Sequence, residues 1–169
     1  MEGSNLNKKG FLTFPENVIV IFSDNSPGWV LQPDFYETAR EPGRKYGIYY
    51  HHALWGSGPH LAQGVSPLKN HEIFKLAVDR QSNQYAILNV SNVREFAMGL
   101  KASSEMLYNF SKFNPDEFLA SWCIQNFGKA AKEAEAAYRQ FFSSYQVHGE
   151  PSIVFLLDGQ MRQKGLGLM

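Results

Sequence analysis

Three apolar runs, each closed by turn-forming or polar residues, constrain the fold of this chain more than any other feature. They cover Val18–Phe22, Tyr46–His52 and Tyr85–Val90, and all are rich in β-branched or aromatic residues, which favours strands. The first run is apolar throughout, as in a strand buried on both faces of a parallel sheet. Helical patterns separate or follow the runs, so the sequence predicts an α/β fold.

Helical periodicity occupies much of the remaining chain. Residues 70–80 carry one apolar helical face, with Asn70 as the expected N-cap. Asn114 and Pro115 mark another start, because proline is favoured in the first turn and Asp116 follows it. Further helices are expected at residues 34–40, 93–109, 115–126 and 129–145.

The charge balance excludes several kinds of partner. The chain has 169 residues with 16 basic and 16 acidic side chains, so its formal net charge is zero. This balance argues against a basic nucleic-acid-binding face and against a polybasic membrane-binding patch. No apolar stretch reaches the roughly 20 residues that a transmembrane helix needs. Neither nucleic acid nor a membrane is therefore an expected partner.

Cofactor motifs are missing from the sequence. The single cysteine, Cys123, excludes an internal disulfide and a cysteine-ligated zinc site. His51, His52 and His60 have no carboxylate at a helical or hairpin spacing, so no metal site is predicted. The glycine-rich segments lack the spacing of a phosphate-binding loop, and no serine lies in a nucleophile elbow. We expect no cofactor.

Polar residues stand at the end of each expected strand. In parallel α/β folds the carboxyl ends of neighbouring strands share one edge, where ligand sites form. These residues are Asp24, Asn25, His51, His52, Asn89 and Asn92. A purely structural interpretation is also open, since Asp and Asn terminate strands by forming Asx turns.

The Tyr49-Tyr50-His51 triplet can be read in two ways. Alternation along a strand sends Tyr49 and His51 to one side of the sheet and Tyr50 to the other. His51 then either donates a hydrogen bond to an anionic or hydroxylated ligand, or is a hydrogen-bonded histidine of the core.

Four segments together are similar to one known family. Phe22–Gly28 is similar to a family motif Trp-x-Asp-Asp-Asn-x-Gly, and Tyr46–His51 to Tyr-Gly-Val-Tyr-Tyr-His. Gly56–Pro59 and Asn89–Asn92 follow where that family has Gly-Gly-Pro and Asn-Val-Gly-Asp. In order and spacing, residues 9–128 resemble the catalytic barrel of glycoside hydrolase family 115, the xylan α-1,2-glucuronidases.

The resemblance implies roles for the strand-end residues. It implies an inverting hydrolysis of glucuronic or 4-O-methylglucuronic acid side groups of xylan, for which an acid and a base stand about 6.5–9.5 Å apart. The carboxylates that match are Asp24 and, near the start of the chain, Glu2. The sugar contacts would be Asn25, Tyr49, Tyr50, His51, Asn89 and Asn92.

The chain also departs from the family pattern. Asn25 and Asn92 stand where the family has acids, and His52-Ala53 replaces Phe-Asp. Two functions therefore stay open: a glycoside hydrolase polypeptide whose activity depends on segments outside this chain, or a non-catalytic carbohydrate-binding or scaffold module. A small nucleotide-binding α/β domain is a third, without a glycine fingerprint to support it.

We expect residues 1–169 to form one domain, a partial (β/α) TIM barrel with parallel strands followed by helices. Three or four strands cannot close an eight-stranded barrel, so the strand edges need a cover. The expected partners are a glucuronoxylan-type carbohydrate and either a second copy or the missing barrel half. Residues 1–9 contain no apolar signal core, whereas the family resemblance implies a secreted or periplasmic protein.

Overall fold

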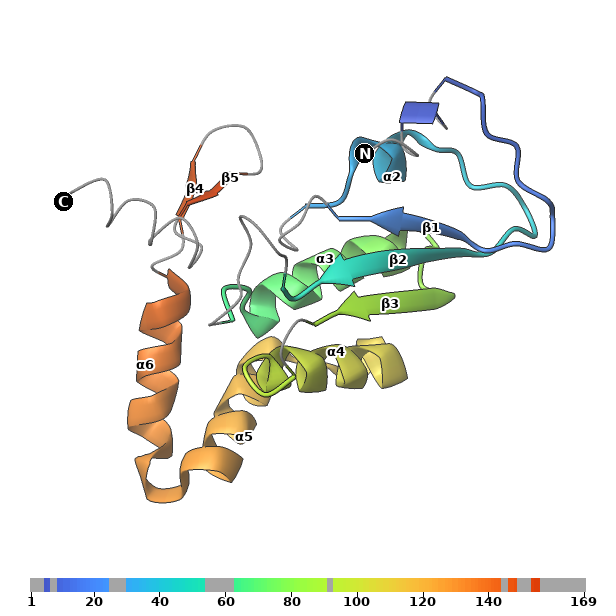
Figure 1. Cartoon of the computed structure of the whole chain (residues 1–169). Coiled ribbons are helices and arrows are strands. Elements are labelled where there is room, and N and C mark those ends of the chain that lie inside the picture. Colours follow the sequence, from blue (N-terminus) through green and yellow to red (C-terminus); the bar gives the residue numbers. More distant parts are fainter. Residues whose placement is uncertain are drawn as a thin grey trace.

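A three-stranded parallel sheet organises the protein. The computed structural model describes residues 5–6, 9–24, 30–53, 63–90, 93–143, 146–148 and 153–155. The sheet contains β1 (Val20–Ser23), β2 (Tyr46–His51) and β3 (Tyr85–Asn89) in that order, so β2 is central (Figure 1). All three expected strands are present and run parallel, which confirms the α/β fold.

Helices connect and follow the strands, as the parallel arrangement requires. They are α2 (Pro33–Glu37), α3 (Pro67–Asp79), α4 (Ala97–Asn109), α5 (Pro115–Phe127) and α6 (Ala131–Ser143), with short 3₁₀ turns at Phe110–Lys112 and Gly128–Ala130. A separate antiparallel pair joins β4 (Gln146–His148) to β5 (Ile153–Phe155). Strands followed by helices in this order are consistent with part of a barrel.

One face of the sheet forms the hydrophobic core. Phe22, Ile48 and Tyr50 are at most 2% exposed. The Tyr50 ring packs edge-on against Phe74 of α3, with 5.5 Å between ring centroids. Met106 of α4 belongs to the same cluster. Burial of these large side chains anchors α3 and α4 to the sheet.

The opposite face of the sheet is open within the described part of the chain. Tyr85 and Ile87 of β3 are 51% and 41% exposed, and in the register of the sheet they lie beside Gly47 and Tyr49. Val18 and Ile19, at the start of the first run, are also exposed. The expectation that this run is buried on both faces is therefore wrong, because the helices that the structure describes pack on one face of the sheet.

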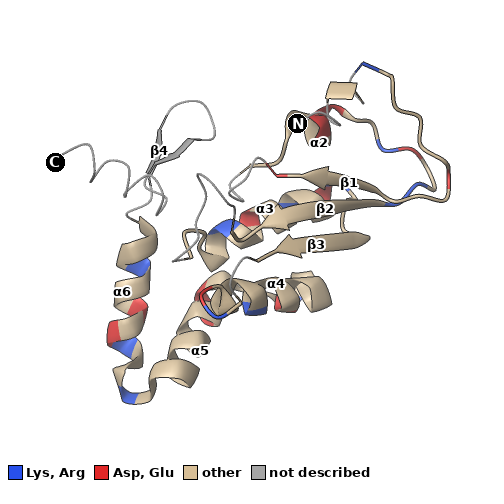
Figure 2. Ribbon diagram, in the orientation of Figure 1, with Lys and Arg blue, Asp and Glu red and all other residues tan. Residues whose placement is uncertain are grey.

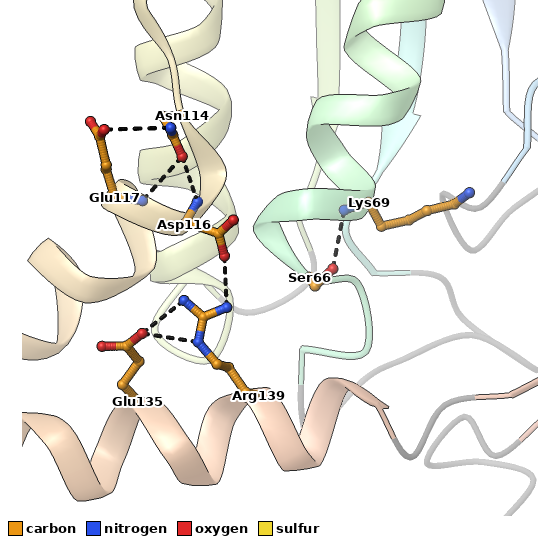
Figure 3. A network of polar contacts seen from close by, with 7 residues as sticks. All are labelled: Ser66, Lys69, Asn114, Asp116, Glu117, Glu135 and Arg139. Carbon is orange, nitrogen blue, oxygen red and sulfur yellow. Dashed lines mark hydrogen bonds and ion pairs between the residues drawn. The ribbon is translucent and has the colours of Figure 1, made fainter.

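The helix starts confirm one prediction and correct another. Asn114 caps α5, with its Oδ1 accepting hydrogen bonds from the main-chain N–H groups of Asp116 and Glu117 (Figure 3). Asn70 does not cap α3, however. Ser66 does, through an Oγ that accepts from Lys69 N at 3.1 Å, and Asn70 lies fully buried one turn inside the helix. The helix begins earlier because Pro67 fits its first turn.

Helices α5 and α6 form a hairpin around Gly128, whose φ of 53° favours glycine. Arg139 of α6 reaches Asp116 of α5 and Glu135 of its own helix, both at 2.7 Å (Figure 3). Charged side chains lie on the helices and connecting segments, whereas β1, β2 and β3 contain none (Figure 2). In the described ranges, no helix is long and apolar enough to cross a membrane.

Candidate functional site

The carboxyl ends of β1 and β2 bring Asp24 and His51 into direct contact. Asp24 Oδ1 lies 2.5 Å from His51 Nδ1, and Asp24 Oδ2 accepts the main-chain N–H of His51 at 2.8 Å. The Asp24 side chain is fully buried and that of His51 is 6% exposed. A buried carboxylate is stable only when paired and hydrogen-bonded, and here both of its oxygens are engaged.

The carboxyl end of β3 adds Asn89 to the same edge. Parallel pairing places Asn89 beside His51, and Asn89 Nδ2 donates to the Tyr49 hydroxyl at 3.0 Å. The Tyr49 ring lies against the His51 imidazole, with 4.4 Å between centroids. Asp24, His51, Tyr49 and Asn89 thus form one continuous set of contacts across three strands, as the strand-end pattern predicts.

Tyr50 lies on the other face of the sheet. It is completely buried, its hydroxyl donates to Asn70 Oδ1 at 2.7 Å, and its ring packs on α3. Burial, and secondarily the charge of Asp24, raise the pKa of Tyr50 well above its ordinary value. Strand alternation thus separates Tyr50 from Tyr49 and His51, as expected. Tyr50, a sugar contact by resemblance, is instead buried in the core in this structure.

His52 is also a core residue. It is fully buried, and its Nε2 lies 3.0 Å from Ser103 Oγ of α4. Its Nδ1 has no hydrogen-bond partner among the described residues. Burial lowers the pKa of His52 to about 4, so the imidazole is neutral at pH 7.

Three of the residues assigned by resemblance lie outside the described ranges. These are Glu2, Asn25 and Asn92. Their roles as a catalytic carboxylate and as sugar contacts therefore stay predictions.

Gln32 adjoins the site although nothing in the sequence marks it. Its main-chain N–H donates to Ser23 O at 3.0 Å, and its Nε2 donates to Asp24 O at 3.2 Å. A return of the chain to β1 creates this contact, through a bridge between Asp24 and Leu31. This contact depends on how the chain folds back in three dimensions, so no local sequence pattern around Gln32 could predict it.

Carboxylates are scarce at this edge. Asp24 is the sole acidic residue in residues 17–33, and residues 46–66 and 85–94 contain none. Among the described residues, no cluster of three or more His, Cys, Asp or Glu side chains could hold a metal ion. The site is built mainly from neutral hydrogen-bonding and aromatic groups, which suit a polyhydroxylated ligand.

A cavity of about 500 Å³ lies elsewhere, between the start of α4 and the α5–α6 hairpin. Aromatic side chains of Trp122, Phe127 and Tyr138 line it, with Arg94 and Glu95 beside them. Asp24, Tyr49, His51 and Asn89 are not part of its lining. The strand-end site is thus distinct from this cavity.

An α/β sheet whose polar groups gather at the carboxyl strand ends is the arrangement of a barrel-type ligand site. The profile of glycosyl hydrolase family 115 matches residues 1–151. The chain belongs to glycoside hydrolase family 115.

A solved structure agrees with this assignment in fold. It is a family 115 4-O-methyl-α-glucuronidase with specificity for decorated arabinogalactans, 24% identical, with a TM-score of 0.70. The match covers 80% of this chain and 18% of that enzyme, so the present chain spans a small part of its length. No functionally curated protein is detectably similar to the chain.

Proposed function

We propose that this chain supplies part of the substrate site of an inverting α-glucuronidase. The substrate would be a plant polysaccharide, xylan in the first place, that carries glucuronic or 4-O-methylglucuronic acid side groups. The observation that carries the proposal is the contact set of Asp24, His51, Tyr49 and Asn89 at the carboxyl ends of three adjacent strands. Membership of family 115 supports the hydrolase class.

The chemistry of these groups suits a uronic acid. Histidine, tyrosine and asparagine provide donors and acceptors for sugar hydroxyls, and their donors also bind a carboxylate. The ring of Tyr49 adds an aromatic surface for the apolar face of a sugar. Neutral contacts of this kind need no metal.

Inversion requires a general acid and a general base at the sugar, and Asp24 is buried against His51 with both oxygens engaged. General acid and base stand about 6.5–9.5 Å apart, with a water between the base and the sugar. We infer that carboxylates able to reach the sugar come from Glu2 or from polypeptide beyond this chain. The missing barrel half would also cover the open face of the sheet, where Tyr85 and Ile87 are exposed.

The scarcity of carboxylates favours a second candidate function. With Asp24 buried against His51 and no other acid at the described strand ends, the isolated chain fits a non-catalytic carbohydrate-binding module. This module would retain the sugar contacts without hydrolysis.

Hydrolysis and binding assays separate the two functions. Release of glucuronic acid from glucuronoxylan or from a glucuronate-decorated arabinogalactan, lost in Asp24→Ala, would support the hydrolase. Calorimetric binding of glucuronate without release, weakened by Asn89→Ala, would support the binding module. Neither release nor binding by the wild-type chain would contradict both proposals.

A further inference from the structure

We propose that Asp24 is a positioning residue that fixes the His51 imidazole with hydrogen on Nδ1, so that Nε2 accepts a hydrogen bond from a ligand hydroxyl. This inference rests on the proposed function for the identity of the ligand, a glucuronic acid group. It differs from a direct catalytic role for Asp24, because it makes His51 the group that contacts the ligand.

The geometry of Asp24 excludes direct contact with a sugar. Its side chain is fully buried, one oxygen accepts the His51 main-chain N–H at 2.8 Å, and the other faces His51 Nδ1 at 2.5 Å. A general acid or base must come within hydrogen-bond reach of the proton that it transfers. Asp24 therefore acts on a ligand through His51.

The contacts of Asp24 also decide the tautomer of His51. An ionised carboxylate accepts hydrogen bonds and donates none, so Nδ1 carries the hydrogen. A neutral imidazole then has a lone pair on Nε2, which has no protein partner among the residues that the structure describes. The hydrogen bond of one ring nitrogen thereby sets the role of the other.

Tyr49 supplies the complementary group next to His51. Its hydroxyl oxygen already accepts from Asn89 Nδ2, and among the described residues its own O–H has no acceptor, so it can donate to a ligand. The Tyr49 ring packs against the His51 imidazole, with 4.4 Å between ring centroids, so both groups belong to the same strand-end site. An acceptor beside a donor matches neighbouring hydroxyl groups on a sugar ring.

Replacement of Asp24 by asparagine should reverse the tautomer. The amide oxygen still accepts the His51 main-chain N–H, so the amide nitrogen faces Nδ1 and donates to it. The imidazole hydrogen then moves to Nε2, and the acceptor for the ligand is lost. The same substitution in Ser-His-Asp enzymes keeps the geometry but leaves the histidine in the wrong tautomer.

Long-range ¹H–¹⁵N correlation spectra of the full chain test the tautomer without any ligand. We expect the Nδ1–H form of His51 in the wild type and the Nε2–H form in Asp24→Asn. If the wild-type spectrum shows the hydrogen of His51 on Nε2, the proposal is wrong, whatever the variants show. An unchanged tautomer in folded Asp24→Asn also overturns it, because a merely structural role for Asp24 predicts no such switch.

Titration with D-glucuronate tests the consequence for the ligand. We expect Asp24→Asn to bind at least tenfold more weakly than wild type, while the exposed control Asp79→Asn binds as wild type. A tautomer switch with equal binding refutes the acceptor role of Nε2. If the tautomer changes in Asp24→Asn but neither the wild type nor any variant binds glucuronate, the proposed function is contradicted, whereas the positioning of His51 by Asp24 is supported.

Discussion

Tyr49 and Tyr50 are neighbours on β2 whose hydroxyl groups serve opposite faces of the sheet. The Tyr49 hydroxyl accepts a hydrogen bond from Asn89 at the strand-end site, whereas the Tyr50 hydroxyl donates to Asn70 Oδ1 in the core. The pair therefore separates the proposed ligand site from the core at adjacent positions of one strand.

Removal of the two hydroxyl groups should have different effects. Tyr50→Phe leaves the buried Asn70 Oδ1 without its donor, so we expect the free energy of unfolding to fall by about 1–3 kcal/mol. Tyr49→Phe should leave stability within about 0.5 kcal/mol, since Tyr49 is only partly buried, and should weaken glucuronate binding. Urea unfolding and calorimetric titration measure both effects. Weaker binding in Tyr50→Phe at unchanged stability would contradict this assignment.

The buried His52 should make the fold sensitive to acid. Its pKa is about 4 in the folded chain, against an ordinary value of 6.5. The unfolded chain therefore binds the proton more readily, and stability falls as the pH drops from about 6.5 to about 4. The full loss from this group is about 3 kcal/mol.

Urea unfolding at pH 7.5, 5.5 and 4.5 measures this loss, with His52→Gln as the comparison. We expect the variant to be less stable at pH 7.5 but to have a flatter dependence on pH. The pKa of His71 is also lowered by burial and by Lys75. His71 therefore contributes part of the pH dependence of stability that remains in His52→Gln. Equal slopes for the wild type and His52→Gln would refute the prediction.

The close approach of α4 to β2 depends on Gly99. A Cβ at this position would lie 2.7 Å from His52 Nδ1 and 3.1 Å from Gln63 Oε1. We expect Gly99→Ala to lower the free energy of unfolding by about 1–3 kcal/mol through overpacking, although alanine is the better helix former. In a His52→Ala background the cost should shrink, because the clashing ring is gone.

A double-mutant cycle of Gly99→Ala and His52→Ala measures this coupling. Additive effects of the two substitutions would show that the clash lies elsewhere. Ser104→Ala, at an exposed position of the same helix, provides the control for a substitution in α4.

The open face of the sheet should promote association of the isolated chain. Ile87 is 41% exposed on edge strand β3, and exposed apolar strand edges favour pairing with other chains. We expect light scattering to show concentration-dependent association that Ile87→Lys reduces. Ile124→Lys, on α5 and 64% exposed in the wild type, should leave association unchanged. A monomer at all concentrations, or an equal effect of both variants, would contradict this role of the open face.

The sequence alone determined the order and type of the main elements. Strands Tyr46–His51 and Tyr85–Asn89 are near their predicted bounds, and the start of α5 at Pro115 follows from the local signals of Asn114 and Pro115. Such patterns work because strand alternation and helix capping are set by residues close in the chain. The same reasoning placed polar groups at the carboxyl ends of the strands.

Tertiary structure decided what the polar groups do. Asparagine is a common helix cap, yet the Asn70 side chain is buried and accepts a hydrogen bond from the Tyr50 hydroxyl. The family resemblance implies a catalytic role for the Asp24 carboxylate, but in the structure both of its oxygens contact His51. These relationships join residues 20 or more positions apart, so only the packing of strands and helices could establish them.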